Sequence, residues 1–388
     1  MNKTVYLIGT LLLICCQTKK EEIITPSSNE YSINPTEGNK IPLSTIVDRV
    51  EVIQPNESEI IAYAGTPMVF EDKLIIVDSQ KQKKIQVFNT EGDLLFAIQA
   101  TGEEPKNFRT PTFVRINNNR DRLLVYCALT KKVLQFDWKG NFLEETQISE
   151  IGLIGDLIEK DNEIIFLNVM TVDSKKRIGK LNLLTYAEDK KITFFENYPG
   201  EFIRVLESKS HFFFPTKTKD EFYFLDIYSN NLVKMDWEGN HSIIRFIIEN
   251  NPLILDPEKV HNPIDILDQI HLSDAFYLYN YINVGNNKIL LPIIKGPSVH
   301  STILLDTEKN NVEVISKFEN GLDNFLPSEA IAAPGDIHSK TAIVSLDSDY
   351  AYGRIKSMDL DQNEFTKELK KLNTPENQNP VFIIYHLK

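Results

Sequence analysis

The sequence contains little cysteine and no excess of positive charge. Three cysteines occur in 388 residues, and two of them, Cys15 and Cys16, are adjacent. A small secreted scaffold held together by disulfides is excluded, because such scaffolds are dense in cysteine. Lysine and arginine number 42 against 55 aspartate and glutamate, for a formal net charge of −13. This balance argues against nucleic acid as a partner, because phosphate binding needs clustered positive charge.

Long hydrophobic runs and familiar catalytic motifs are also missing. The apolar stretch from Val5 to Ile14 is too short to span a bilayer, and no later stretch is longer. The sequence has no His-Glu-x-x-His, Gly-x-Ser-x-Gly, Walker or Cys-x-x-Cys motif. With 42% hydrophobic and 25% charged residues, the composition is that of a folded protein and excludes a disordered or collagenous chain.

The N-terminus has the pattern of an export signal. Lys3 precedes the apolar run, which ends directly before the two cysteines. The residues Leu13-Ile14-Cys15-Cys16 resemble a bacterial lipobox, in which a leucine stands three positions before the lipidated cysteine. We therefore predict a lipoprotein signal peptide over residues 1–16 and a lipid on Cys16, which anchors the protein without a spanning helix. The alternative is an ordinary signal peptide in which the cysteines are coincidental.

The segment after the anchor, residues 17–40, is predicted to be a flexible tether, because it is rich in Ser, Asn, Pro and Thr. If Cys16 carries lipid, only Cys127 remains, and the mature fold has no internal disulfide. Cys127 lies in the apolar stretch 123–127, which predicts a small buried core residue.

The body of the chain contains a repeat. Residues 85–93, 133–141 and 232–240 each read as an alternating strand followed by Asn/Asp-x-x-Gly-Asn/Asp. Their glycines, at 92, 140 and 239, are 48 and 99 residues apart, close to one period and two. This is hairpin chemistry, in which glycine takes the positive φ of the turn. We place a degenerate copy without glycine at 184–189.

Each repeat contains four short strands in roughly 40–50 residues, which is typical of a propeller blade. A fifth blade is expected over 276–318, and a sixth from strands at 330–333, 341–346 and 381–386. A strand at 45–53 then closes the ring by completing the last blade, which removes the exposed edges. The sequence thus predicts an all-β, six-bladed β-propeller of four-stranded blades over residues 41–388. Residues 250–272 form an insertion, and the apolar spacing at 359–373 predicts a short helix near the C-terminus.

The chain resembles the six-bladed β-propeller lipoproteins of Bacteroidetes, relatives of NHL-repeat propellers. The resemblance rests on Leu43-Ser44-Thr45-Ile46-Val47-Asp48, on the repeated turns, on the loop at 102–108 and on the ending at 379–385. It implies a fold and a location in the outer membrane of the cell envelope, without a defined reaction. The loop departs from the family pattern, since Glu104, Lys106 and Asn107 replace Gly, Gly and Glu. Residues 17–22 resemble the Lys/Glu-rich tags that route some of these lipoproteins to the cell surface, or are a plain solvated tether.

Two groups of side chains are candidates for ligand binding. Tyr277, Tyr279 and Tyr281 alternate and so share one face of a strand, where aromatic rings could stack on sugars or peptides. Arg109, Tyr352 and Arg354 are expected in loops on the rim of the ring. The alternative for the tyrosines is that they fill the space between blades.

Carboxylates recur after the second strand of several blades, as Asp78, Asp226 and Asp347. Several such oxygens around the central channel could hold Ca²⁺. The alternative is that each aspartate ends its strand and forms a local turn. No other cofactor is expected.

A rigid ring with variable loops and no catalytic motif favours a non-catalytic binding module for a glycan, peptide or protein partner at the cell envelope. The alternative is a lyase or hydrolase that uses Ca²⁺ or Zn²⁺ in the channel, and a third hypothesis is a structural subunit of an outer-membrane assembly. We expect a monomer that contacts the membrane only through its lipid, without nucleic acid.

Overall fold

The fold was analysed in a computed structural model. It describes residues 28–65, 67–99, 109–169, 176–195, 212–216, 218, 220–226, 230–256, 265, 268–270, 273–278, 282–284, 287–296, 298–319, 321, 340–356, 369, 372 and 377–388. The signal peptide, Cys16, most of the 250–272 insertion and nearly all of the helix expected at 359–373 lie outside these residues.

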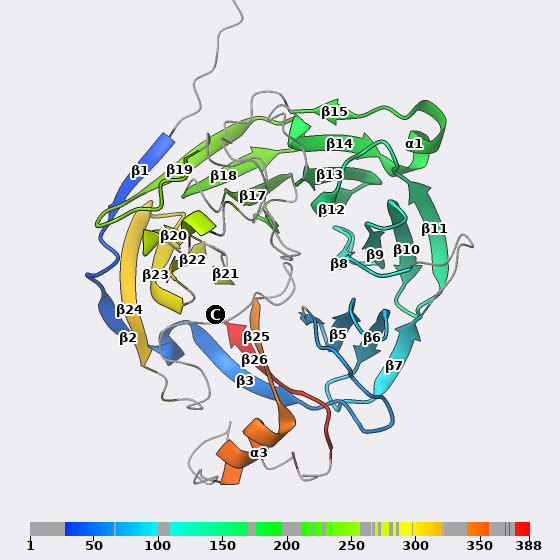
Figure 1. Ribbon diagram of the computed structural model, residues 1–388, viewed down its shortest axis with the longest axis horizontal. Helices are drawn as coiled ribbons and strands as arrows, with labels where there is room; N and C mark the ends of the chain where they lie inside the picture. The colour runs from blue at the N-terminus through cyan, green and yellow to red at the C-terminus, as the bar shows by residue number, and fades with distance from the viewer. Residues whose placement is uncertain are drawn as a thin grey trace, which may run out of the picture.

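Six antiparallel sheets are arranged in a ring around a central axis (Figure 1). Blade one contains β4 (Met68–Phe70), β5 (Lys73–Asp78), β6 (Lys84–Phe88) and β7 (Leu94–Ile98). Blade two contains β8 (Phe113–Ile116), β9 (Arg122–Cys127), β10 (Lys132–Asp137) and β11 (Phe142–Gln147). Blade three contains β12 (Ile154–Lys160), β13 (Glu163–Asn168), β14 (Ile178–Asn182) and β15 (Thr193–Phe194). In each of these three blades the chain runs from the innermost strand to the outermost.

Blades four to six complete the ring. Blade four contains β16 (Phe213–Pro215), β17 (Glu221–Asp226), β18 (Asn231–Asp236) and β19 (His241–Ile248). Blade five contains β20 (Phe276–Leu278), β21 (Ile282–Val284), β22 (Lys288–Lys295), β23 (Ser298–Asp306) and β24 (Asn311–Glu319). Both β20 and β21 pair antiparallel with β22.

The predicted closure of the ring is confirmed. Blade six contains β25 (Thr341–Leu346), β26 (Val381–Leu387) and the N-terminal strand β3 (Val47–Ile53). β3 pairs antiparallel with β26, which joins the two ends of the chain within one sheet. The inner strand expected at 330–333 lies outside the described residues. The six-bladed propeller of four-stranded blades predicted from the repeats is the observed fold.

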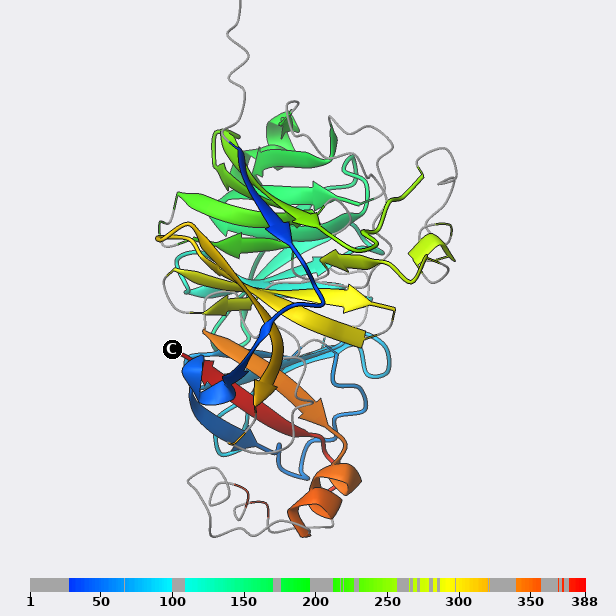
Figure 2. The same cartoon turned by 90° about the vertical axis from the view of Figure 1, so that its left-hand side faces the viewer.

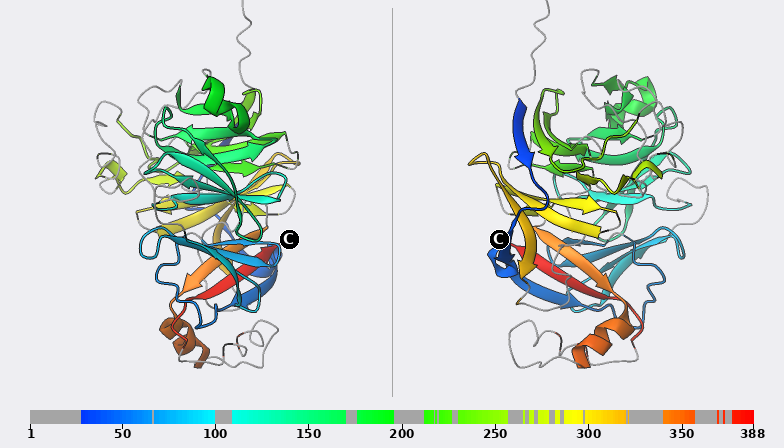
Figure 3. Two further views of the ribbon diagram at one scale, coloured as in Figure 1. Left: turned by 90° about the vertical axis from the view of Figure 1, so that its right-hand side faces the viewer. Right: turned by 60° about the vertical axis from the view of Figure 1, so that its left-hand side comes forward.

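Before it reaches blade six, the chain runs along the outside of two other blades. β1 (Ser28–Ile33) pairs in parallel with β19 of blade four, and β2 (Asn39–Pro42) pairs in parallel with β24 of blade five. A 3-10 turn, η1 (Leu43–Thr45), leads into β3. We call residues 28–42 the N-terminal belt, which Figures 2 and 3 show from the side. Two stretches of the segment expected to be a tether are therefore strands, because the outer edges of blades four and five offer unpaired backbone groups.

The strand order divides the connections between two faces of the ring. The upper face carries the links between successive blades and the links between the second and third strands of each blade. The lower face carries the remaining turns, together with the junction of β26 and β3. In Figure 2 α3 (Ser348–Lys356) projects from one side and the C-terminus lies on the other.

The Asn/Asp-x-x-Gly-Asn/Asp turns join third and fourth strands on the lower face, as the repeat predicts. In the blade-two turn, Asp137 Oδ1 accepts the backbone N–H groups of Lys139 (2.8 Å) and Asn141 (2.8 Å), and Gly140 has φ +78°. The Asn141 side-chain amide also donates to Asp137 and lowers the pKa of its carboxyl group. Asp236 and Asn240 repeat this geometry in blade four.

Two segments that the sequence pattern predicted to be a repeat copy and a loop are helices. The degenerate repeat placed at 184–189 is wrong, because α1 (Leu183–Asp189) occupies the link between β14 and β15. The Asn182 side chain caps this helix through the N–H groups of Leu184 and Thr185, and Lys190 ends it in a left-handed conformation. α3 lies where an irregular loop of blade six was expected.

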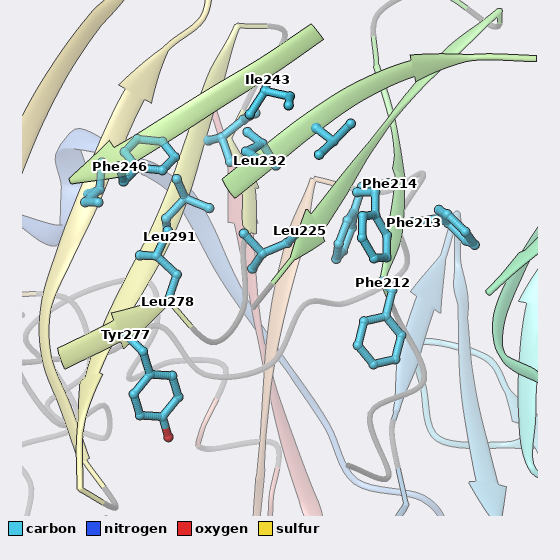
Figure 4. Close-up of a cluster of buried hydrophobic side chains, with 14 of the residues drawn as sticks. Phe212, Phe213, Phe214, Leu225, Leu232, Ile243, Phe246, Tyr277, Leu278 and Leu291 are labelled. Carbon is cyan, nitrogen blue, oxygen red and sulfur yellow. The ribbon is translucent and has the colours of Figure 1, made fainter. Parts of the chain in front are cut away.

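The core lies between the blades, because each sheet buries apolar side chains on both of its faces. One cluster joins blades three, four and five, with Phe213, Phe224 and Leu291 at or near 0% exposure (Figure 4). Cys127 is fully buried in a second cluster between blades one and two, which confirms its predicted core position. No described helix is long and apolar enough to cross a membrane.

Candidate functional site

Five exposed large apolar side chains lie in connections of the upper face, in different blades around the ring. Ile254 is 82% exposed in the link from blade four to blade five, and Leu129 is 71% exposed between β9 and β10. Ile60 is 67% exposed in the link from β3 to β4. Leu153 and Tyr350 are exposed on the same face, in the link to blade three and in α3.

Four further exposed apolar side chains lie elsewhere: Leu95, Leu143 and Ile247 on outer strands, and Leu184 on α1. None of the described turns that carry the Asp-x-x-Gly pattern on the lower face has an exposed large apolar side chain. Because links between blades can vary in length without disturbing the sheets, the upper face is where this fold can carry a binding surface.

The structure separates the side chains that the sequence proposed as a ligand site. Arg109 is exposed in the link between blades one and two. Tyr277 is only 6% exposed and belongs to the core between blades four and five (Figure 4). Tyr279 and Tyr281 lie outside the described residues. For Tyr277 the structure therefore favours the space-filling alternative over an accessible stacking surface.

Tyr352 and Arg354 lie on α3, where Tyr352 is 8% exposed and Arg354 is half-buried. The Tyr352 hydroxyl donates to Gln54 Oε1 at 2.9 Å. Gln54 in turn donates to the backbone carbonyls of Asn377 (3.2 Å) and Asn379 (2.9 Å). Tyr352 therefore helps to fasten α3 and the segment before β26 to the end of β3.

Asn379 is the centre of this fastening. Its side-chain amide donates to the carbonyls of Pro55, Asn56 and Glu59, and its Oδ1 accepts the N–H of Ile61 at 2.9 Å. One buried side chain thus contacts four backbone groups of the link between blades six and one, and Asn377 also donates to the Pro55 carbonyl at 2.9 Å, so that few of these groups are left unpaired.

The channel side of the ring holds a buried ion pair that the sequence pattern did not suggest. Arg115 on β8 and Asp156 on β12 are 1% and 0% exposed at their side chains. Arg115 Nε donates to Asp156 Oδ1 at 2.7 Å, and Nη2 donates to Oδ2. Asp156 Oδ2 also accepts the backbone N–H groups of Phe212 (2.6 Å) and Phe213 (2.8 Å). The pair therefore ties the inner strands of blades two, three and four together.

A bulge directs Asp156 into this position. The register of β12 against β13 shifts between Ile154 and Asp156, which leaves Gly155 unpaired. A Cβ on Gly155 would lie 2.3 Å from the Val169 side chain, so the bulge requires glycine. Burial raises the pKa of the Asp156 carboxyl, which Arg115 opposes by holding it in the charged form.

The aspartates proposed as calcium ligands have local partners where they are described. Asp78 Oδ1 accepts the N–H groups of Gln80 (3.0 Å) and Lys81 (2.7 Å). Asp347 Oδ1 accepts the N–H of Asp349 at 3.0 Å at the start of α3. Both contacts favour the turn-forming alternative, and the side chain of Asp226 lies outside the described residues.

Within the described ranges, no group of three or more His, Cys, Asp or Glu side chains is placed to hold a metal ion. His241, His300 and His386 are described. His211, His261, His271 and His338 are not.

The comparisons with known proteins agree with the fold. A family model described as "Domain of unknown function (DUF4934)" matches residues 30–386. A "Putative exported protein" from Bacteroides fragilis NCTC 9343 is similar in structure, with a TM-score of 0.67 and 14% identity over 93% of this chain and 100% of that one. A member of the DUF4221 family from Bacteroides vulgatus ATCC 8482 is similar, with a TM-score of 0.54 and 12% identity over 88% of this chain and 97% of that one. No curated protein matches the chain.

Proposed function

The chain belongs to the DUF4934 family, and from that premise and the geometry of the upper face we propose that it is an exported, non-catalytic module that binds a protein or peptide. The observation that carries the proposal is the exposure of Ile60, Leu129 and Ile254 on the same face of the ring. Burying one such side chain against a partner contributes about 2 kcal/mol to the free energy of binding.

The nature of the exposed side chains favours a polypeptide over a glycan. Sugar-binding surfaces rely on exposed aromatic rings, but Tyr277 and Tyr352 are buried. The two tryptophans lie in lower-face turns, where Trp138 stacks on Phe70 at 4.8 Å and Trp237 is 6% exposed. Tyr350 is the exposed aromatic of the described upper face, among aliphatic side chains. Aliphatic anchors of this kind fit an apolar partner surface.

Export and anchoring belong to the same proposal. The first 16 residues have the pattern of a lipoprotein signal, and the B. fragilis protein of similar fold carries the name "Putative exported protein". We place the protein at the outer membrane, attached by a lipid on Cys16, with the ring outside the cytoplasm. The metal-dependent lyase or hydrolase stays a prediction, since four of the seven histidines lie outside the described residues.

Site-specific photocrosslinking tests the binding face. A photoreactive amino acid is introduced at Ile60, Leu129 or Ile254, and in control variants at Leu143 or Leu184, in cells that export the protein. We expect a discrete adduct that contains polypeptide from the upper-face positions alone. Ile254→Asp should lower the yield of adduct at Leu129 by about tenfold, because a charge replaces a buried apolar contact.

Adducts of equal yield at Leu143 and Leu184 would contradict the proposal, because these side chains are also exposed but lie off the upper face. Adducts that contain glycan in place of polypeptide would contradict the choice of partner class.

A further inference from the structure

The first three blades share a pair of adjacent cations at or just before the start of the third strand. Each pair ends an upper-face link between second and third strands, and the pairs are Lys83-Lys84, Lys131-Lys132 and Lys176-Arg177. These three blades follow one another around the right-hand side of the ring in Figure 1. The equivalent links of blades four and five, residues 227–230 and 296–297, contain no cation.

The second cation of each pair is used within the fold. Lys84 and Lys132 form ion pairs with glutamates, at nitrogen–oxygen distances of 3.4 Å and 3.0 Å. Arg177 is 2% exposed, and its guanidinium lies 5.6 Å from the centre of the Phe224 ring. These three cations therefore have a structural role between or within blades.

The first cation of each pair faces solvent. Lys83, Lys131 and Lys176 are exposed, and so is Lys81 in the blade-one link. We call these four lysines the basic arc. In the described part of the chain, the side chains of Lys81 and Lys83 have no hydrogen bond or ion pair, and Lys131 Nζ donates to the neutral Ser149 carbonyl at 3.1 Å. The arc is thus positive surface on a chain whose formal net charge is −13.

The backbone at two of these lysines is in the left-handed region. Lys83 has φ +55° and Lys131 has φ +50°. Glycine and asparagine adopt this conformation at less cost than lysine, and Asn230 takes it at the equivalent place in blade four, with φ +55°. Lysine at this position lowers the stability of the fold, so its charge is available to a partner rather than needed within the ring.

The acidic side chains described in these upper-face links are already engaged. Asp78 is fully buried with its local N–H partners, and Glu150 lies 2.9 Å from Lys190. On the lower face an exposed acid neutralises its neighbour, since Lys73 pairs directly with Asp72. Among the described residues, the basic arc lacks the counter-charge that the lower-face lysine has.

Two exposed aliphatic side chains lie between the cations of blades two and three. Leu129 is 71% exposed two residues before Lys131, and Leu153 is 39% exposed in the link from blade two to blade three. One end of that link adjoins the arc, because the Ile148 N–H donates to the Lys131 carbonyl at 2.8 Å. The other end adjoins the blade-three link, because the Val169 N–H donates to the Leu153 carbonyl at 2.9 Å. Positive and aliphatic side chains therefore alternate along this part of the upper face.

We propose that the basic arc binds an acidic segment of the partner polypeptide, in which carboxylates alternate with apolar side chains. The inference rests on the proposed function and specifies the chemistry of the partner. Charge complementarity gives specificity and fast association, while Leu129 and Leu153 add apolar contact. A short acidic segment fits better than a long polyanion, because the net charge of −13 repels extended negative charge.

Binding of two synthetic peptides to the purified exported chain tests the chemistry of the partner. One labelled peptide alternates Glu and Leu with serine spacers, and the matched peptide carries Gln in place of every Glu. By fluorescence anisotropy we expect the acidic peptide to bind with a dissociation constant on the order of 100 µM, and the neutral one at least about tenfold more weakly. Raising the salt from about 50 to about 200 mM should weaken the acidic peptide by about threefold or more, because the lysines are exposed.

Reversal of charge on the basic arc tests the residues. Lys83→Glu/Lys131→Glu should weaken binding of the acidic peptide by about tenfold or more. Lys191→Glu/Lys317→Glu is the matched control, because both lysines are exposed, have no ion pair in the described part of the chain and lie off the arc. The control changes the net charge by the same amount and should leave the affinity within about twofold.

A third variant, Lys83→Asn/Lys131→Asn, separates binding from folding. Asparagine adopts the left-handed conformation more readily than lysine, as Asn230 does. We expect this variant to bind the acidic peptide about fivefold more weakly while its melting temperature rises by about 1–2 °C. Weaker binding by a more stable chain cannot come from a loss of structure.

Two results with the peptides would overturn the proposal: equal binding of the acidic and neutral peptides, or a control variant that weakens binding as much as reversal on the arc does. Tighter binding to vesicles that contain phosphatidylglycerol than to the acidic peptide would also overturn it, since the arc would then be a membrane contact.

The photocrosslink at Leu129 distinguishes these failures from a failure of the proposed function. We expect Lys83→Glu/Lys131→Glu to lower the yield of polypeptide adduct at Leu129 by about tenfold. An adduct that this variant leaves unchanged would overturn the acidic partner and leave the proposed function standing. The absence of polypeptide adducts from every upper-face position would overturn the proposed function itself.

Discussion

The side chain of Asp156 connects three blades of the ring. It accepts hydrogen bonds from Arg115 on blade two and from two backbone N–H groups at the inner strand of blade four. A charged pair at this depth is retained only when nearly every lone pair and proton is used, because desolvation of each ion costs several kcal/mol. Arg115 Nη1 is the exception, since it is buried without a hydrogen-bond partner among the described residues.

Removing Arg115 should destabilise the protein strongly. We expect Arg115→Met to lower the free energy of unfolding by about 3 kcal/mol, because the Asp156 carboxylate is left buried without its cation. Arg115→Met/Asp156→Asn should recover part of this loss, since the neutral amide keeps an acceptor for the N–H groups of Phe212 and Phe213. Urea unfolding followed by fluorescence measures both.

The control pair for this experiment is Lys190 and Glu150, which are 2.9 Å apart but 59% and 48% exposed at their side chains. Lys190→Met should cost about 0.5 kcal/mol or less. Equal costs at Arg115 and Lys190 would mean that burial does not set the value of the pair.

At the scale of elements, the turn chemistry of the blades could be read from the sequence and the belt could not. The Asp137 turn is local, because every group that it uses lies within five residues. The pairing of β1 with β19 joins Ser28 to Ile243, more than 200 residues away. A polar segment such as 25–38 has the composition of a linker, and residues 28–33 within it form a strand only because an open sheet edge lies beside them. Similarly, α1 depends on the cap at Asn182, in a blade whose repeat had lost its glycine.

The packing of the N-terminal belt predicts that substitution by alanine affects the free energy of unfolding differently at Gly38 and at Gly353. A Cβ on Gly38 would lie 2.7 Å from the Ser316 backbone nitrogen and 2.9 Å from the Val314 carbonyl oxygen. We expect Gly38→Ala to push β2 away from β24 and lower the free energy of unfolding by about 1–3 kcal/mol. Exchange of the backbone amide hydrogens of residues 39–41 should become faster.

Gly353 on α3 is the matched control, because nothing lies within 4 Å of its Cβ position. Gly353→Ala should be neutral or raise the free energy of unfolding by up to about 1 kcal/mol, as alanine favours helix over glycine. If Gly38→Ala left the free energy of unfolding as little changed as Gly353→Ala does, the belt would not lie as close to blade five as the structure has it.

At the scale of the whole molecule, the belt determines which part of the ring lies nearest to a lipid anchor on Cys16. Eleven residues, 17–27, separate Cys16 from Ser28, and a chain of that length reaches roughly 35–40 Å when fully extended. The described chain begins on the outer edge of blade four, at the rim of the ring (Figure 1). A lipid on Cys16 would therefore hold the rim near the membrane and leave the upper face accessible from the side.

Substitution of the two adjacent cysteines tests the anchor. We expect Cys16→Ser to move the protein from the membrane fraction to the soluble fraction and to abolish incorporation of labelled fatty acid. Cys15→Ser should remain in the membrane fraction, since the residue before the cut only needs to be small. If Cys15→Ser lost the fatty-acid label and Cys16→Ser kept it, the lipid would be on Cys15. A wild-type chain that incorporates no labelled fatty acid would contradict the anchor.

The sequence by itself determined the number of blades, the lower-face turns and the closure of the ring, because each follows from local periodicity and from the need to pair sheet edges. It also determined that Cys127 is a core residue, since its neighbours are apolar. Only the tertiary structure decided which polar side chains matter. Arg115 and Asp156 are 41 residues apart and meet because successive blades turn about one axis. The candidate tyrosines show the converse, since alternation along a strand is the same for a ligand-binding face and for a face buried between blades. Whether such a face binds a ligand or is buried depends on the neighbouring blade. The side chain of Tyr277 is buried in the core between blades four and five.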